Sequence, residues 1–232
     1  MPCASRSASS MFAHTLVTLD GPAGVGKTTI AKRLAAHLQI AYMDTGAMFR
    51  SVAWLLGEGA WELPEAELGK RLKGLAFRLD GSGAASHLLL NETPLPADIR
   101  TETVAAWASN LAALPLIREF LKTAQQAIGS ARSLTAEGRD MGTVVFPQAR
   151  YKFFLDATPA ERAERRCLQL AAMGLPADYQ IILEQIQQRD IKDRTRAVAP
   201  LVAAADAVVL DTSNMDVDQV FARILTALAP VK

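Results

Sequence analysis

The chain has 232 residues, of which 50% are hydrophobic and 21% are charged, with 14 glycines and 11 prolines. This is the composition of an ordinary globular protein, and it excludes a disordered, collagenous or disulfide-scaffold chain. The 25 Lys and Arg residues against 24 Asp and Glu residues give a formal net charge of +1. That balance excludes a protein that coats nucleic acid or an acidic membrane, so any anion-binding site must be local.

The cysteine content and the hydropathy predict a protein of a reducing, aqueous compartment. Cys3 and Cys167 lie far apart in the sequence, which supports neither a disulfide framework nor a metal cluster. No apolar run approaches the ~18 residues of a membrane-spanning helix, and the N-terminal segment lacks the apolar stretch of a secretory signal. We expect a cytoplasmic protein without a membrane partner, with a disordered tail at 1–12, Met11 as an alternative start and a folded domain at 13–230.

In chain order, the first pattern is a strand, a glycine-rich turn and a helix. Apolar and β-branched residues predict the strand at 15–19, and apolar residues at every fourth position predict a helix over 28–38. A second strand is expected at 40–43. Three further strands, each followed by a helical pattern, are expected at 134–137, 151–155 and 207–210. Strands that alternate with helices predict an α/β fold with a doubly wound parallel sheet.

Two segments depart from this alternation. Between about residues 70 and 111, strand patterns at 76–80 and 87–91 flank a glycine turn and predict an antiparallel β hairpin in a small inserted subdomain. Residues 159–196 are helical and rich in charge, and a Gly-Leu-Pro break at 174–176 predicts two helices joined by a turn.

The turn after the first strand carries the most specific motif. Residues 21–28 read Gly-Pro-Ala-Gly-Val-Gly-Lys-Thr and match GxxxxGK[ST], in which backbone N–H groups cradle phosphate oxygens. Lys27 is expected to reach the β and γ phosphates, and Thr28 to offer its hydroxyl to Mg²⁺. The candidate nucleotide-binding residues are Gly21, Pro22, Ala23, Gly24, Val25, Gly26, Lys27, Thr28 and Thr29. The loop by itself serves kinases, hydrolytic switches and motors alike.

Two strand ends add candidate polar groups. Thr45 and Arg50 follow the second strand and are expected at the carboxyl edge of the sheet, where such folds bind ligands. The alternative is a helix cap at Thr45 with Arg50 as a surface cation. Arg139 and Asp140 follow the third strand between glycines, where they could grip a phosphate and a polar ligand edge. The alternative for this pair is a solvated turn with a local ion pair.

A run of charges at 188–196 closes the helical segment. Taken in isolation, such a run favours an exposed, salt-bridged helix face.

Together these segments resemble the bacterial cytidylate kinase family, P-loop enzymes that phosphorylate CMP and dCMP from ATP. The similarity extends from about Thr15 to Ala229, and its most specific pieces are 20–29, 44–50, 138–147 and 189–200. The resemblance implies a P-loop kinase core, with the insert at about 70–111 as the monophosphate-binding subdomain and about 159–190 as a helical lid. It also implies ATP and Mg²⁺ as cofactors and CMP or dCMP as the small-molecule substrate. We expect a monomer.

The resemblance assigns roles residue by residue. Arg50 and Arg139 match the arginines on the acceptor phosphate, which needs at least two charge-assisted donors. The positions that read cytosine are matched by Asp140, Arg118, Arg196 and Thr45. The sugar positions are matched by Ser109, Arg189 and Asp193. The lid positions over ATP are matched by Arg162 and Arg166. The residues expected to act in catalysis are Lys27, Arg50, Arg139 and Arg166.

Chemistry supports part of this assignment and leaves alternatives open. The carboxylate of Asp140 would accept from the exocyclic amine of cytosine but face an oxygen in uracil, which favours C over U. For Arg162 and Arg166 the alternative is a solvated helix face, and Arg165 competes for the same assignment. Small P-loop kinases acting on UMP, AMP or shikimate remain rivals. A guanine-dependent switch is disfavoured because the sequence contains no NKxD segment.

Overall fold

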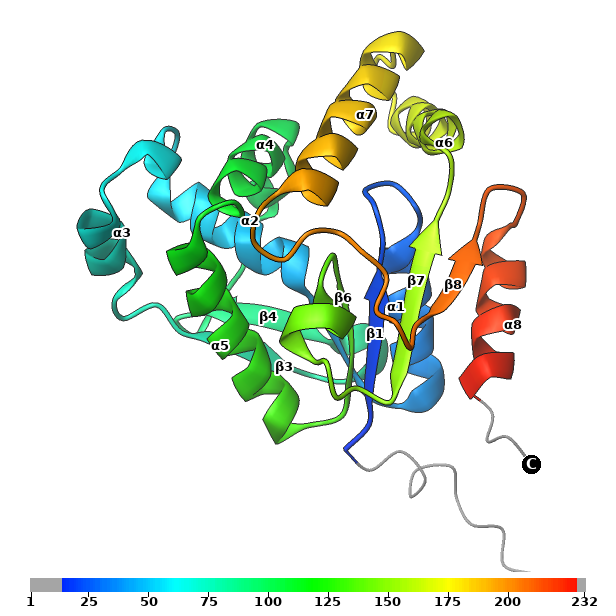
Figure 1. Cartoon of the computed structure of the whole chain (residues 1–232), viewed down its shortest axis with the longest axis horizontal. Helices are drawn as coiled ribbons and strands as arrows, with labels where there is room; N and C mark the ends of the chain where they lie inside the picture. Colours follow the sequence, from blue (N-terminus) through cyan, green and yellow to red (C-terminus); the bar gives the residue numbers. More distant parts are fainter. Residues whose placement is uncertain (1–13, 229–232) are drawn as a thin grey trace, which may run out of the picture. The chain divides into compact units, whose positions relative to one another are not determined.

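The computed structural model describes residues 14–228 (Figure 1). They divide into two compact units, one formed by residues 14–17 and 31–136 and the other by residues 18–30 and 137–228. The predictions that lie outside the described residues are those for Cys3, Met11 and the tail at 1–12.

Five strands form one sheet in the order β2-β6-β1-β7-β8. Their bounds are β1 Leu16–Asp20, β2 Ala41–Asp44, β6 Leu134–Gly138, β7 Tyr151–Asp156 and β8 Val208–Asp211. Every neighbouring pair is separated in the chain by at least one helix, as the crossovers of a parallel sheet require. The predicted parallel α/β sheet is confirmed, and each expected strand lies within a residue or two of its observed bounds.

Burial differs between the two edge strands of the sheet. All residues of the inner strand β6 are buried, because an inner parallel strand is covered on both faces. The edge strand β2 is also fully buried. The edge strand β8 is exposed, with Val209 at 59%. Helix α8 (Val217–Leu228) runs alongside β8 in Figure 1 and buries Val220, Ile224 and Leu228, which recur every fourth residue.

The first unit contains the inserted subdomain. Its three-stranded antiparallel sheet has the order β3 (Phe77–Asp80), β4 (His87–Leu90) and β5 (Thr93–Pro94), with Leu79 opposite Leu88. The predicted hairpin is confirmed, whereas β5 was not expected because a two-residue strand ending in proline carries no alternating pattern. The helices are α2 (Thr45–Leu56), α3 (Glu65–Leu72), α4 (Glu102–Leu111) and α5 (Pro115–Ala131), with 3-10 turns at Ala60–Glu62, Gly83–Ala85 and Ala97–Arg100.

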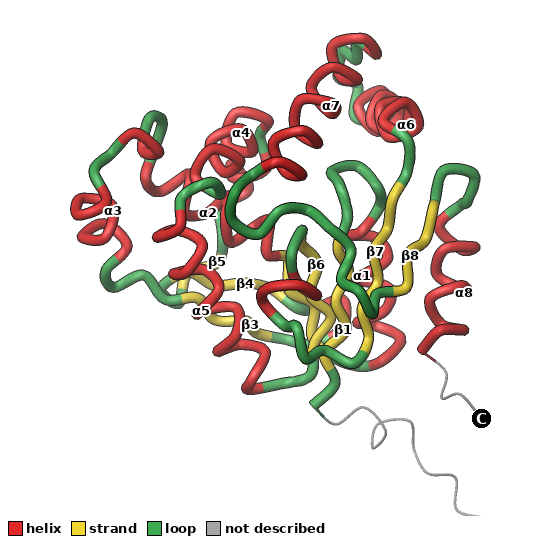
Figure 2. Tube along the Cα trace, in the orientation of Figure 1, coloured by secondary structure: helices red, strands yellow, loops and turns green. Residues whose placement is uncertain are grey.

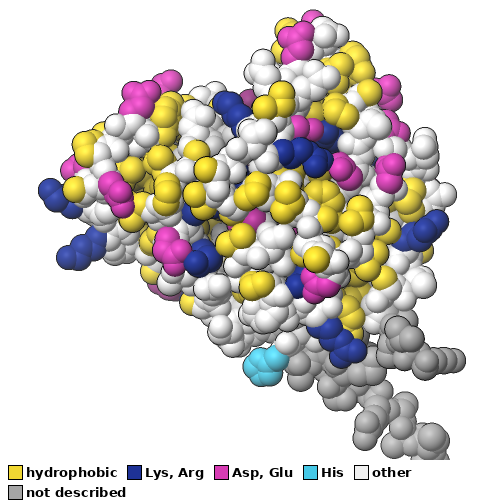
Figure 3. Space-filling model, viewed as in Figure 1, with side chains coloured by type: hydrophobic (Ala, Val, Ile, Leu, Met, Phe, Trp, Pro, Cys, Tyr) yellow, Lys and Arg dark blue, Asp and Glu magenta, His cyan; other side chains and the backbone are white. Residues whose placement is uncertain are grey.

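The second unit contains the predicted pair of helices, α6 (Pro159–Ala172) and α7 (Tyr179–Thr195), which follow β7 in Figure 2. The hydroxyl of Thr158 caps α6, and the carboxylate of Asp178 caps α7. Between them Gly174 adopts a left-handed φ of 70°, so the helix break predicted at 174–176 is confirmed. The end of this pair presents hydrophobic side chains beside acidic ones (Figure 3).

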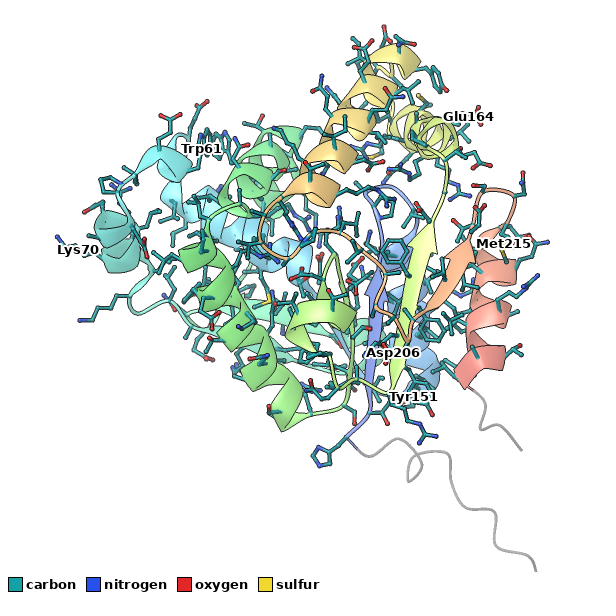
Figure 4. The ribbon with its side chains drawn as sticks, viewed as in Figure 1. Trp61, Lys70, Tyr151, Glu164, Asp206 and Met215 are labelled. Carbon is teal, nitrogen blue, oxygen red and sulfur yellow. The ribbon has the colours of Figure 1, made fainter. Side chains whose placement is uncertain are left out.

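An ion pair fixes the chain between α7 and β8 to the sheet. Lys152 on β7 donates from Nζ to Oδ2 of Asp206 at 2.7 Å, and Figure 4 places Asp206 beside the start of β7. Lys152 is buried, so its ammonium needs this carboxylate. Over residues 14–228, none of the helices has both the length and the apolar character needed to cross a bilayer. The expected domain bounds at 13–230, 70–111 and 159–190 stay predictions.

Candidate functional site

The glycine-rich loop lies between β1, which ends at Asp20, and α1 (Lys27–Leu38), which begins one residue before the prediction. Gly21 has a φ of 147°, and a Cβ there would lie 2.0 Å from the carbonyl oxygen of Leu155 on β7. Only glycine permits this approach. Beside Gly26, by contrast, a Cβ would meet no atom within 4 Å. The loop therefore packs against β7 on one side and leaves space at Gly26, where backbone N–H groups can receive an anion.

Lys27 folds back over this loop. Its Nζ donates to the carbonyl oxygens of Gly21 at 2.8 Å and Pro22 at 2.6 Å, and the side chain is buried. Burial lowers the pKa of Lys27 well below its ordinary value, and the positive charge of Arg139 lowers it further, against the opposing pull of Glu137. A buried ammonium that donates to carbonyl oxygens can exchange them for phosphate oxygens.

Thr28 contacts a carboxylate that sequence reasoning did not single out. Its Oγ1 donates to Oε2 of Glu137 at 3.0 Å, and Glu137 is buried near the end of β6. Hydroxyl and carboxylate oxygens are ligands that Mg²⁺ accepts, usually alongside phosphate oxygens and water. Over residues 14–228 no group of three or more His, Cys, Asp or Glu forms a metal cage. The donor set therefore fits a cation that arrives with a phosphate.

Arg139 and Asp140 meet two residues of the charged run in the same unit. Arg139 donates from Nε to Oδ2 of Asp193 at 2.8 Å, and Arg196 lies 3.7 Å from Oδ1 of Asp140 and 3.8 Å from Oδ1 of Asp193. Burial opposes ionisation of Asp193, but Arg139 and then Arg189 and Arg196 lower its pKa below the ordinary value. The alternative of a solvated turn is wrong, because Asp140 is only 4% exposed.

The alternative of a fully exposed helix face at 188–196 is also wrong. Asp190 and Asp193 on α7 are both buried, whereas Ile191 between them is 62% exposed. The helix thus turns one acidic face inward, and those carboxylates meet the arginines of the unit.

Arg162 differs from the other lid candidates because its side chain is buried. It is 1% exposed, forms a buried ion pair with Asp190, and donates to the carbonyl oxygens of Ala157 at 3.0 Å and Ala23 at 3.1 Å. A solvated helix face is therefore wrong for Arg162, which joins α6, α7 and the glycine-rich loop. Arg166 is half-buried and donates from Nη1 to Oε1 of the exposed Gln169 at 2.9 Å.

Arg165, the competing arginine, is committed to the end of β8. Its guanidinium donates to the hydroxyl of Thr212 at 3.3 Å and to the Thr212 carbonyl. This contact favours a structural role for Arg165.

The first unit assembles its own cationic group around Asp44. This carboxylate caps α2 by accepting from the N–H of Ala47 at 2.8 Å, so the alternative of a cap at Thr45 is wrong. Arg50 lies 3.2 Å and Arg100 lies 3.4 Å from Oδ2 of Asp44. Arg100, whose side chain is 60% exposed, was missed because an arginine at the end of a short 3-10 turn gives no pattern of its own.

The remaining candidates of this unit lie on α2, α4 and α5. Arg118 is buried, donates from Nη1 to the carbonyl of Ala112 at 3.1 Å, and holds its guanidinium 5.6 Å from the ring centroid of Phe49. Thr45 is buried as the first residue of α2, and Ser109 is half-buried on α4. Each unit thus gathers part of the predicted residues.

Comparison with known proteins gives consistent matches. The family model described as cytidylate kinase matches residues 17–229. A cytidylate kinase of Oleidesulfovibrio alaskensis is 58% identical over 94% of this chain and 100% of its own length. A cytidylate kinase of Maridesulfovibrio salexigens is 58% identical over 90% of this chain and 94% of its own. An uncharacterised protein from Eubacterium ventriosum has a similar fold, with a TM-score of 0.50 at 13% identity over 93% of this chain and 98% of its own.

Lys27→Met should make the fold more stable while it removes phosphate affinity. Because the pKa of Lys27 is lowered by folding, its ammonium destabilises the protein at neutral pH, and this cost declines as pH rises toward the ordinary lysine pKa. We expect the free energy of unfolding, measured with urea, to rise by about 1 kcal/mol at pH 7 and by less at pH 10. ATP binding should weaken at least tenfold.

The matched control is Lys70→Met. Lys70 is exposed on α3 and is labelled in Figure 4. We expect neither stability nor ATP binding to change, and a Lys27→Met protein less stable than wild type at pH 7 would contradict the argument.

Asp190→Asn should destabilise the fold by about 3 kcal/mol, because it leaves the Arg162 guanidinium buried without its counter-charge. Urea unfolding measures the loss. The double variant Arg162→Met with Asp190→Leu should recover most of it, and the exposed control Glu67→Gln should change stability by less than about 0.5 kcal/mol. A loss below about 1 kcal/mol in Asp190→Asn would show that Arg162 is not held by this pair.

Proposed function

The chain belongs to the cytidylate kinase family, and on this premise we propose that it transfers the γ-phosphoryl group of ATP to CMP or dCMP, giving ADP with CDP or dCDP. One observation of the structure favours a kinase over a nucleotide switch. The compact unit that contains the phosphate loop also contains a cluster of charged side chains, namely Arg139, Asp140, Asp193 and Arg196. Arg139 is close enough to lower the pKa of Lys27. A switch needs no second polar site beside its triphosphate site.

The donor site is proposed to be the loop at 21–29. Backbone N–H groups of the loop and the start of α1 would receive the β and γ phosphates, and the Lys27 ammonium would leave the Gly21 and Pro22 carbonyls for them. Thr28 and Glu137 would hold Mg²⁺ together with phosphate oxygens. When bound, the ion neutralises charge on the transferred group.

The acceptor phosphate is proposed to bind Arg139 and Arg50. In the structure each guanidinium is paired with a carboxylate, Asp193 and Asp44 respectively. A dianionic phosphate offers more charge than either carboxylate and can share the same donors. Two charge-assisted donors also fix the phosphate oxygen for in-line attack.

No general base is required, because the attacking oxygen of CMP is already anionic at neutral pH. The protein's contribution is then to hold two anions together and to exclude water. Lys27, Arg139 and Arg50 would supply the positive charge that makes the approach of two anions favourable. Arg166 on α6 is proposed to complete this charge from the lid.

The base is proposed to be read by Asp140 with Arg118, Arg196 and Thr45. Arg196 lies 3.7 Å from Oδ1 of Asp140, and the carboxylate oxygens of Asp140 can accept from the cytosine amine. Ser109, Arg189 and Asp193 are proposed to bind the sugar. The burial of Arg162 supports a role in holding the loop through Ala23 in place of one as a mobile lid arginine. Monomeric state and cytoplasmic location stay predictions from the sequence.

The reaction is tested by ADP release from ATP and Mg²⁺ with CMP, dCMP, UMP, AMP, GMP, shikimate or no acceptor. We expect turnover to require CMP or dCMP, with kcat/KM for UMP at least tenfold lower because Asp140 would face a carbonyl oxygen. Release without any acceptor would identify a switch. A different preferred acceptor would keep the kinase and overturn the base-site assignment.

Arg139→Met should raise the KM for CMP at least tenfold and lower kcat, since one charge-assisted hydrogen bond is worth about 1.5–3 kcal/mol. The KM for ATP should change less than threefold. The matched control is Arg194→Met on α7, whose exposed pair with Asp156 contributes little. An equal loss of ATP affinity in Arg139→Met would show that Arg139 does not serve the acceptor.

A further inference from the structure

Asp20 is a buried carboxylate to which the mechanism above gives no task. It is the last residue of β1, directly before Gly21, and it is 4% exposed. Its two oxygens accept two backbone hydrogen bonds, Oδ1 from the N–H of Met141 at 2.9 Å and Oδ2 from the N–H of Gly142 at 2.7 Å. The residue before the phosphate loop is thus bonded to the chain directly after Arg139 and Asp140.

The two donors match the two oxygens of a carboxylate. Met141 and Gly142 begin a π-helical turn, Met141–Val145, whose first N–H groups have no partner within the turn, and the side chain of Asp140 does not cap it. A carboxylate can accept from two such donors at once, whereas an amide offers one oxygen. Both donors would compete for a single acceptor if residue 20 were asparagine.

The absence of a side chain at Gly142 matters for this contact. A Cβ at position 142 would lie 3.1 Å from Oγ1 of Thr18, 3.3 Å from Cδ of Lys152 and 3.4 Å from Oδ2 of Asp20. The distances to Thr18 and Lys152 are tighter than ordinary packing, so the absence of a side chain lets residue 142 lie close to both while its amide reaches the carboxylate.

The ionised carboxylate is costly at this position. Burial raises the pKa of Asp20 to about 6, although the hydrogen bonds from Gly142 and Met141 lower it, and the charges of Asp140 and Lys27 act in opposite directions. An apolar residue would avoid the cost of desolvation but would leave two donors without acceptors. A buried carboxylate at this position therefore lowers stability but fixes the turn that begins at Met141.

We propose that Asp20 is a positioning residue, which fixes the Arg139–Asp140 turn to the strand that leads into the phosphate loop and thereby sets acceptor affinity and base selectivity. Arg139 and Asp140 are held through their side chains by Asp193 and Arg196 on the α7 side. From the end of β1, the side chain of Asp20 holds the backbone of the same turn. The inference rests on the proposed function for its kinetic readout, while its structural readout does not depend on activity.

The test compares Asp20→Asn with wild type. We expect the KM for CMP to rise about tenfold, the ratio of kcat/KM for CMP to that for UMP to fall at least threefold, and the KM for ATP to change less than threefold. Hydrogen exchange at the amides of Met141 and Gly142 should accelerate at least tenfold, while the amides of β7 keep their rates.

Two further variants separate position from charge and from stability. Gly142→Ala keeps the carboxylate but pushes the amide away, so it should reproduce the changes in KM and selectivity. Asp216→Asn makes the same chemical change in a carboxylate that accepts from the N–H of Gln219 at the start of α8, and it should change none of the kinetic constants.

The outcomes distinguish the two proposals. A wild-type protein that does not phosphorylate CMP overturns the proposed function, and the exchange rates then decide whether Asp20 holds the turn. Variants at Asp20 and Gly142 that lose stability in urea, yet keep the KM for CMP and the base selectivity, reduce Asp20 to a purely structural residue. A rise in the KM for ATP equal to that for CMP would also overturn the inference.

Discussion

Mutual neutralisation of buried charge is the constraint on which the second unit depends. Carboxylates and cations that leave water must pair with one another or with backbone dipoles, or the fold loses several kcal/mol for each. Here Asp190 neutralises Arg162, Asp193 neutralises Arg139, and Lys27 is held by loop carbonyls. Because each partner comes from a different element, satisfying the charges also fixes the loop, the end of β6 and α7 with respect to one another.

The same constraint orients the arginines of the proposed site in the absence of ligands. Arg139 faces Asp193, and Arg50 faces Asp44, so each arginine is already oriented and desolvated in part by a carboxylate. When a phosphate replaces or joins the carboxylate, little further side-chain entropy is lost, because the arginine is already ordered. Lys27 follows the same principle with carbonyl oxygens as the partners that phosphate would displace.

Backbone contacts complement these ion pairs. The approach of Gly21 to Leu155 fixes the loop on β7, and the donation of Met141 and Gly142 to Asp20 fixes the turn after β6 on β1. The first contact needs a glycine, because a Cβ at position 21 would lie 2.0 Å from the carbonyl oxygen of Leu155. In the second, a Cβ at position 142 would crowd Thr18 and Lys152. The strand ends of the sheet are thus held at fixed spacing by short backbone contacts, and the charged side chains are presented from them.

The sequence by itself determined the order of strands and helices, the phosphate loop and the family, because these depend on local periodicity and on contiguous motifs such as residues 21–28. It also placed Arg139 and Asp140 at a strand end. Only the tertiary structure decided the partners: Glu137 for Thr28, Asp190 for Arg162, and Arg100 beside Arg50. It likewise decided that Asp44 and not Thr45 caps α2. Such pairings join residues far apart in the chain, and a single sequence carries no signal of which distant charge will be buried beside another.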